Sequence, residues 1–347
     1  MRLFRKTARH DLLNEAFMKA VTHRITRMLF TLCAVALLTD AAIPARAQSP
    51  AVVPITIAWA IGYAGPQIPV ASAMGLWKAA GTDPKIVTFA TGPLAFEALI
   101  GGQVDFMTTA ELPAVTAAMR NQQFTIVADL SRFHGNRIVA NFPVPTIASL
   151  AGKKIGTVLG TSSQFLLESD LKSNGVKAEI LNVAPSDVAA ALARGDIDAA
   201  LPFVDVIPLV KKTLGDRYHE IRIPEETHFV LIASRDMATK RPEIVRSVLS
   251  AMLGADKAIK ANPTLAQTTV SQAMQGLVSA DQLKAAWPDY DFEARLDERL
   301  PELMTTEGQW IAAGGMIKNV TPTIQLFRSV IDDRPLKAIS SSRVTLK

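Results

Sequence analysis

Three consecutive hydroxyl residues, Thr161, Ser162 and Ser163, follow Gly160 and are the clearest candidates for ligand chemistry in the sequence. We predict a strand before them and a helix over 165–172 after them. The first amides of a helix lack partners within the helix and carry partial positive charge, so they suit an anion. Hydroxyl groups there add hydrogen-bond donors without adding charge. A simpler role is also open, in which one of the hydroxyls only caps the helix.

Similar polar residues follow predicted strands earlier in the chain. Thr91 begins a helix predicted over 94–100, and a capping role explains it as well as ligand contact does. Thr108, Thr109 and Glu111 follow the next predicted strand. Glu111 either faces the ligand, where it would prefer an amine or hydroxyl, or is an acid placed favourably in the first turn of a helix.

Phe203 and Asp205 occupy the equivalent place in the second half of the chain. Asp205 precedes a helix predicted over 206–214, which makes capping the simpler of its two roles. Ligand contact is the other role. We keep both residues as candidates for the binding site.

Catalytic patterns are missing from the sequence. His134, His219 and His228 lack the spacing of a metal site, and we interpret them as surface or hinge residues. The only cysteine, Cys33, lies in the N-terminal leader described below. The chain has no Gly-x-Ser-x-Gly elbow, no Gly-x-Gly-x-x-Gly turn and no Walker phosphate loop. We therefore expect no catalytic residue, no metal site and no cofactor, and we predict that the protein is not an enzyme.

A nine-residue pattern occurs twice, at 98–106 and at 191–199, and both copies have the form Ala-Leu-x-x-Gly-x-(Val/Ile)-Asp-(Phe/Ala). Each copy predicts the end of a helix, a left-handed glycine and the start of a strand. In open α/β sheets, ligands bind beyond the carboxyl ends of the strands. The repeat therefore predicts two similar lobes, each offering one strand-end loop to a shared cleft.

Strands alternate with helices twice along the chain, which indicates an α/β fold with two parallel-sheet lobes. We assign residues 48–145 to the first part of lobe 1, 146–230 to lobe 2, and 231–347 to a helical second part of lobe 1 with a loose tail. This order requires two hinge crossings between the lobes. Such a hinge allows two lobes to close around a ligand.

The first 47 residues differ from the rest in charge. They hold eight of the 37 Lys and Arg residues and three of the 32 Asp and Glu residues, which leaves 29 of each sign in the remainder. A neutral remainder weakens any assignment to nucleic-acid binding. The basic flank, the apolar run over 28–38 and Ala45-Arg46-Ala47 are typical of a signal peptide cleaved before Gln48. We expect a periplasmic protein secreted by this cleavable signal.

The chain resembles the periplasmic solute-binding proteins of ABC importers of the nitrate, sulfonate and taurine type. The resemblance rests on the repeated motif, on the run at 71–77 (Ala-Ser-Ala-Met-Gly-Leu-Trp), and on 150–156 followed by Gly160-Thr161-Ser162. It implies a Venus-flytrap fold and a permease partner. The second-lobe loop departs from the family pattern, because Leu201-Pro202-Phe203 stands where a tryptophan is common.

The resemblance also implies where the ligand contacts fall. They lie in the loop after the first strand and at the strand ends already considered, and the full set is Ile61, Gly62, Tyr63, Thr91, Thr108, Thr109, Glu111, Thr161, Ser162, Ser163, Phe203 and Asp205.

We expect an exported binding protein, monomeric, that captures a small anionic organic ligand, such as a taurine-like sulfonate or an aromatic acid, for an ABC importer. A thiamine-pyrimidine precursor binding or synthesis protein of the same fold is the alternative. An enzyme of this fold would need a reactive His or Cys in the cleft. The ligand-sensing half of a regulator would need a DNA-binding or signalling domain.

Overall fold

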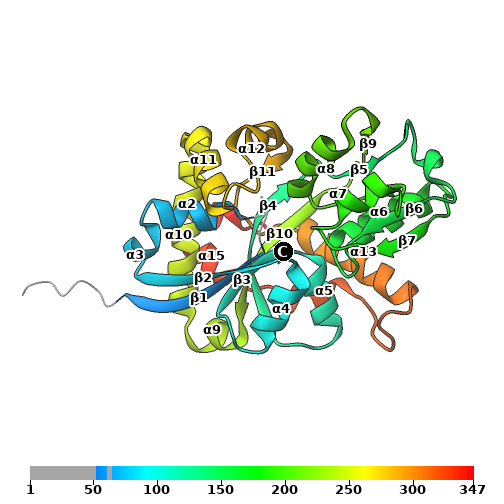
Figure 1. The fold of residues 1–347 in the computed structure, drawn as a ribbon. Helices are drawn as coiled ribbons and strands as arrows, with labels where there is room; N and C mark the ends of the chain where they lie inside the picture. Colours follow the sequence, from blue (N-terminus) through cyan, green and yellow to red (C-terminus); the bar gives the residue numbers. More distant parts are fainter. Residues whose placement is uncertain (1–51, 61–64) are drawn as a thin grey trace, which may run out of the picture. The chain divides into compact units, whose positions relative to one another are not determined.

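The structure, a computed structural model, describes residues 52–60 and 65–347, and two β-sheets form its framework (Figure 1). The first sheet has the strand order β11-β4-β10-β3-β1-β2, with β1 (Val53–Ala60), β2 (Thr82–Phe89), β3 (Phe106–Ala110), β4 (Phe124–Phe133), β10 (Thr227–Ser234) and β11 (Tyr290–Asp291). The second has the order β7-β6-β8-β5-β9, with β5 (Arg137–Ala140), β6 (Lys154–Thr157), β7 (Glu179–Asn182), β8 (Ala199–Ala200) and β9 (His219–Arg222).

Both sheets are mixed, although the sequence predicts parallel ones. The pairs β1–β2, β1–β3, β6–β7 and β6–β8 are parallel. However, β10 runs antiparallel to β3 and β4, and β5 runs antiparallel to β8 and β9. The strands β5 and β10 cause this difference. Each is the first strand after a crossing and enters its sheet from the opposite end.

The two copies of the repeated motif form the same local structure. Gly102 and Gly195 have φ values of +70° and +79°, the left-handed conformation that the motif predicts. The motif aspartates are also equivalent. Asp105 Oδ2 accepts a hydrogen bond of 2.7 Å from the Thr56 amide, and Asp198 Oδ2 accepts one of 2.8 Å from the Lys154 amide. Each aspartate thus ties the start of its own strand to the neighbouring parallel strand.

The chain crosses between the sheets at 133–137 and again at 222–227. Asn136 joins the two crossings, because its side-chain amide donates to the Glu225 carbonyl at 3.0 Å and to the Thr227 hydroxyl at 3.1 Å. The first crossing comes earlier than the predicted lobe boundary at 145/146, since β5 already pairs with β8 and β9.

Helices cover both faces of the first sheet, with α2, α3 and α10 on one side and α4 and α5 on the other (Figure 1). The helices are α2 (Gln67–Ala73), α3 (Leu76–Ala79), α4 (Gly92–Ile100), α5 (Leu112–Met119), α6 (Ser162–Ser173), α7 (Val188–Arg194), α8 (Ile207–Leu214), α9 (Arg235–Lys240), α10 (Pro242–Ala261), α11 (Pro263–Ala273), α12 (Ala280–Ala286), α13 (Arg299–Ala313), α14 (Ile324–Arg328) and α15 (Arg334–Ile339). Over the described ranges, no helix is both long and apolar enough to span a membrane.

The C-terminal tail is packed against the protein, so the expectation of a loose tail is wrong. Leu336 of α15 is completely buried in the core. Arg343 Nη1 lies 2.6 Å from Asp256 Oδ2 of α10, and its side chain is only 18% exposed. A few apolar and charged anchors thus hold a segment whose composition is mostly polar.

Candidate ligand-binding site

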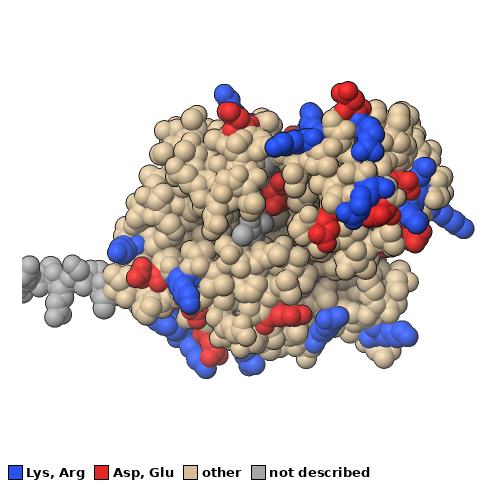
Figure 2. Space-filling model, viewed as in Figure 1, with Lys and Arg blue, Asp and Glu red and all other residues tan. Residues whose placement is uncertain are grey.

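A pocket lies where the carboxyl ends of parallel strands from both sheets meet, and about 730 Å³ of empty space, which includes open solvent at its mouth, lies among its lining residues. Its lining consists of Ala60, Ala90, Thr91, Gly92, Pro93, Thr109, Ala110, Pro113, Phe133, Asn136, Thr161, Ser162, Ser163, Pro202, Phe203, Val204, Asp205, Thr227, Phe229 and Tyr290. On the face shown in Figure 2, the central hollow is bordered mainly by uncharged residues, and charges of both signs are scattered around it.

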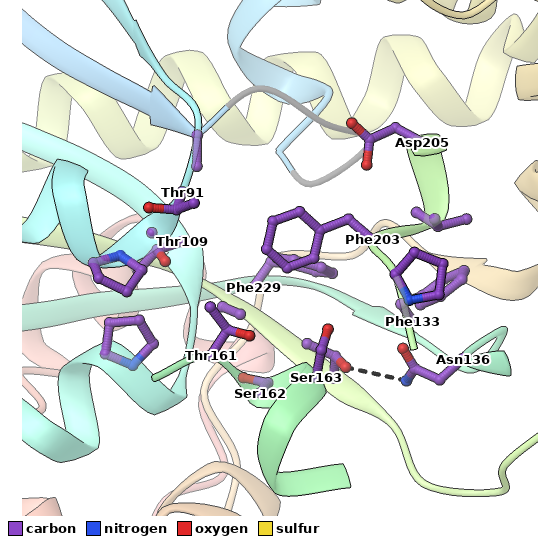
Figure 3. Close-up of a pocket in the computed structure, with 18 of the residues that line it drawn as sticks. Thr91, Thr109, Phe133, Asn136, Thr161, Ser162, Ser163, Phe203, Asp205 and Phe229 are labelled. Atoms are coloured by element: carbon purple, nitrogen blue, oxygen red, sulfur yellow. Dashed lines mark hydrogen bonds between the residues drawn. The ribbon is translucent and has the colours of Figure 1, made fainter. Parts of the chain in front are cut away.

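The three hydroxyls at the start of α6 have different surroundings. The Thr161 hydroxyl donates a 2.6 Å hydrogen bond to the Val158 carbonyl, and no side chain caps the helix. The Ser162 Oγ atom is buried without a hydrogen-bond partner in the described part of the chain. The Ser163 hydroxyl points into the cavity (Figure 3). None of the three hydroxyls therefore performs the predicted capping role.

The start of α4 faces the same pocket from the first sheet. Thr91 has the extended conformation of an N-cap residue, but its side chain makes no capping hydrogen bond. The next residue, Gly92, packs closely on Thr109, and a Cβ atom at Gly92 would lie 2.0 Å from the Thr109 Oγ1 atom. The helix can approach the sheet this closely only because position 92 is glycine.

Aromatic rings form one wall of the pocket. The ring centroids of Phe133 and Tyr290 are 4.5 Å apart, and those of Phe229 and Tyr290 are 6.5 Å apart. Phe203 extends into the cavity from the second sheet's side (Figure 3). Such faces suit a flat ring or the alkyl part and cation of a small molecule.

Asp205 is the one carboxylate among the described pocket-lining residues. Burial raises the pKa of this carboxyl to about 6, and only a hydrogen bond from its own backbone opposes the increase. No Lys, Arg or His is among the described lining residues, so no cation there offsets its charge. The capping role predicted for Asp205 is not observed, since α8 begins at Ile207 without a side-chain cap.

Two candidates from the sequence do not line the pocket. Thr108 is buried within β3, and its hydroxyl lies beneath Gly65. Glu111 is 1% exposed, and its Oε2 atom accepts a 2.9 Å hydrogen bond from the His228 amide. The chain turns into α5 at Glu111, which directs this side chain away from the pocket and between packed elements. Ile61, Gly62 and Tyr63 lie outside the described residues.

Several lining residues were not predicted from the sequence. Phe133 and Asn136 belong to the first crossing, Thr227 ends the second, and Phe229 lies just after it in β10. The sequence predicts two crossings, but no residue pattern in it indicates that these four side chains line the pocket. Tyr290 comes from a two-residue strand far along the chain, and no sequence pattern indicates its position.

The surroundings of His228 show that it is not a surface residue. It directly follows the second crossing, as a hinge residue would, but it is only 1% exposed. Its Nδ1 atom is 2.7 Å from Asp129 Oδ2, and its Nε2 atom is 2.9 Å from Glu226 Oε1. Although burial opposes the charged ring, these carboxylates raise its pKa to about 10. No His, Cys, Asp or Glu group that could hold a metal ion occurs among the described residues.

Two α/β sheets joined by two crossings, with a pocket between their strand ends, define a protein with the periplasmic-binding-protein fold. The chain belongs to the NMT1/THI5-like family, whose model matches residues 67–266. The crystal structure of the periplasmic aliphatic sulphonate-binding protein from Escherichia coli superposes with a TM-score of 0.67 at 19% identity, covering 79% of this chain and 91% of that one. The resemblance found in the sequence is thereby confirmed.

Curated relatives are also binding proteins. A putative binding protein of Brucella abortus (strain 2308) is 29% identical over 220 residues, which are 61% of this chain and 68% of that protein. The taurine-binding periplasmic protein of Escherichia coli (strain K12) is 27% identical over 182 residues, which are 50% of this chain and 57% of that protein. These relatives agree with the prediction that the protein is a binding protein rather than an enzyme.

Proposed function

We propose that this protein is an exported solute-binding protein that captures a small organic molecule in the pocket and delivers it to an ABC permease. The family and the fold support the binding role. For the ligand, we propose a molecule that carries an anionic group and a basic nitrogen, the amino-sulfonate type to which taurine belongs.

The starts of α4 and α6 support the anionic group. Both helices begin at the pocket, and neither has a side-chain cap that would occupy its first amides. The first amides of a helix attract negative charge through their free N–H groups and the helix dipole. The hydroxyl of Ser163, which points into the cavity, adds a neutral donor.

Asp205 supports the proposal that the ligand contains a basic nitrogen. A carboxylate that is partly shielded from water, with no cation among the described lining residues, is poorly compensated in the empty pocket. A ligand ammonium or N–H group would supply the missing partner through a charge-assisted hydrogen bond. A simple sulfonate or nitrate would leave Asp205 unpaired.

The aromatic wall favours a second candidate ligand, an amino-substituted pyrimidine of the thiamine-precursor type. The rings of Phe133, Phe203, Phe229 and Tyr290 provide apolar faces on which a flat heterocycle can stack. Its exocyclic amine would take the same place beside Asp205. An aromatic acid would use the same wall but not Asp205.

The remaining proposals concern the location of the protein in the cell, its oligomeric state and its recognition by the permease. The predicted signal peptide over 1–47 lies outside the described residues, and it supports a periplasmic location. We further propose that the protein is a monomer, and that its two lobes close on the ligand before the permease recognises the closed form.

Thermal unfolding against a ligand panel tests this function. The panel holds taurine, alkyl and aromatic sulfonates, nitrate, aromatic carboxylates and aminopyrimidines. A ligand at 100 times its Kd stabilises the folded protein by about 2.7 kcal/mol, and we expect this from taurine or from an aminopyrimidine.

The variant Ser163→Ala should reduce the shift in melting temperature, whereas Ser250→Ala, at an exposed position on α10, should leave it unchanged. A strong response to nitrate alone would contradict the proposed ligand class. No response to any compound would contradict both ligand candidates.

A further inference from the structure

Two carboxyl groups are buried together behind the start of α6. Glu111 precedes α5 and Glu307 lies on α13, and their side chains are 1% and 0% exposed. The two carboxyls contact each other. Both Glu307 carboxyl oxygens are buried without a hydrogen-bond partner in the described part of the chain, and Glu111 is the charged group there that acts on this carboxyl.

Two buried carboxylates in contact cannot both be ionised, because each would raise the energy of the other in a site that excludes water. The surroundings decide which one is neutral. The Glu111 carboxyl accepts the His228 amide and faces the charged His228 ring, which Asp129 and Glu226 flank. Glu307 faces only Glu111, and burial and that neighbour raise the pKa of Glu307 well above 4.5.

Ser162 is the third member of this cluster. Its buried Oγ atom has no hydrogen-bond partner in the described part of the chain, and its hydroxyl faces the Glu111 carboxyl, whose pKa it lowers. The neighbouring Ser163 hydroxyl points into the cavity, whereas the Ser162 hydroxyl does not (Figure 3). The first turn of α6 thus offers one hydroxyl to the pocket and one to the carboxyl pair.

We propose that Glu111 and Glu307 share one proton and that this pair accepts the Ser162 hydroxyl, which makes Glu307 a positioning residue for the ligand-binding end of α6. Glu307 then donates its proton to Glu111, and Glu111 accepts from Glu307, from Ser162 and from the His228 amide. The part of this inference that concerns the ligand rests on the proposed function.

A second chain of hydrogen bonds supports the same role for α13. Trp310 Nε1 donates to Glu168 at 3.1 Å, Gln164 donates to Glu168 at 2.8 Å, and the Gly160 amide donates to Gln164 at 2.8 Å. Glu307 and Trp310 are three residues apart on one face of α13. That face therefore fixes both the loop before α6 and the first turn of the helix.

The shared proton is tested without any ligand, by thermal unfolding of the unmodified chain, Glu307→Gln and Glu302→Gln over about pH 5 to about pH 9. Glu302 is exposed on the same helix and serves as the control. The raised pKa means that the proton on Glu307 stabilises the fold at low pH and that this stabilisation is lost as the pH rises. The Gln variant should therefore gain stability relative to the unmodified chain as the pH increases, and the control should not. Parallel curves for all three proteins would overturn the proposal.

The positioning role is tested by titrating taurine into Glu307→Gln, Glu307→Leu, Ser162→Ala and the double variant Ser162→Ala/Glu307→Leu. The Gln variant keeps a donor for Glu111 and should bind within about twofold, whereas the Leu variant should bind about tenfold more weakly. The double variant should be no weaker than the Leu variant, because Ser162 acts through the pair. Independent effects that simply add would overturn the role. If taurine fails to bind the unmodified chain, the proposed function fails, and the pH experiment still decides on the shared proton.

Discussion

Replacing Asp205 by asparagine is expected to weaken taurine binding by about 100-fold near neutral pH. A hydrogen bond to a charged group contributes about 1.5–3 kcal/mol, and the amide cannot replace the ionic part of this contact. The control is Asp187→Asn, an exposed carboxylate before α7, which should leave the Kd unchanged. Isothermal titration of both variants measures the difference. Equal affinity of Asp205→Asn and the unmodified chain would remove the nitrogen from the proposed ligand.

The same residue predicts the pH dependence of binding. Burial raises the pKa of Asp205 to about 6, so the carboxyl becomes protonated below that pH and loses its attraction for an ammonium group. Taurine affinity should therefore fall as the pH drops through about 6, and the Asp205→Asn variant should lack this fall.

In the ligand-free protein, ionised Asp205 has an unfavourable effect on stability, the opposite of its favourable effect on binding. The raised pKa means that ionised Asp205 destabilises the folded state, so Asp205→Asn should raise the melting temperature above pH 6. A residue that lowers stability while it serves binding is typical of a functional site.

The second large effect is expected at Asp129, where Asp129→Asn should reduce the free energy of unfolding by about 3–5 kcal/mol. Asp129 Oδ2 lies 2.7 Å from His228 Nδ1 and 3.0 Å from Arg132 Nη1, and all three side chains are buried. The substitution leaves both cations without this counter-charge beside the hinge. Denaturant unfolding measures the loss, and Asp83→Asn, at an exposed position on β2, is the control.

The loss of stability expected for Asp129→Asn also depends on pH. The pKa of His228 is raised from 6.5 to about 10, so its ion pair stabilises the fold fully below 6.5 and ceases to do so as the pH rises through about 10. The difference in stability between the unmodified chain and Asp129→Asn should therefore narrow over that range. A loss below about 1 kcal/mol at neutral pH would contradict the role given to this buried network.

The repeated motif explains why much of the fold was predictable from the sequence. Its glycines act locally, through a left-handed turn that follows from residue type and spacing. Its aspartates instead bind amides of strands 49 and 44 residues away, a role that the motif alone does not predict. The strand-end loops with Thr91, Ser163 and Asp205 follow from the same logic, since parallel strands place their carboxyl ends together.

The rest of the site depends on contacts between distant parts of the chain. Tyr290 reaches the pocket only because a short strand pairs with β4. Glu111 follows a strand end like its neighbours, yet its side chain is drawn toward Glu307 and the His228 amide. No local pattern contains these partners, so the sequence predicts the place of the pocket better than its full lining.

The central claim is that the pocket recognises an anionic group and a basic nitrogen on one small molecule. Isothermal titration with taurine, ethanesulfonate and ethylamine tests it most directly, because the last two each lack one of the groups. We expect taurine to bind and each of the others to bind at least about tenfold more weakly, since each leaves one partner in the pocket unpaired. If ethanesulfonate binds as tightly as taurine, Asp205 has no part in recognition and the claim is wrong.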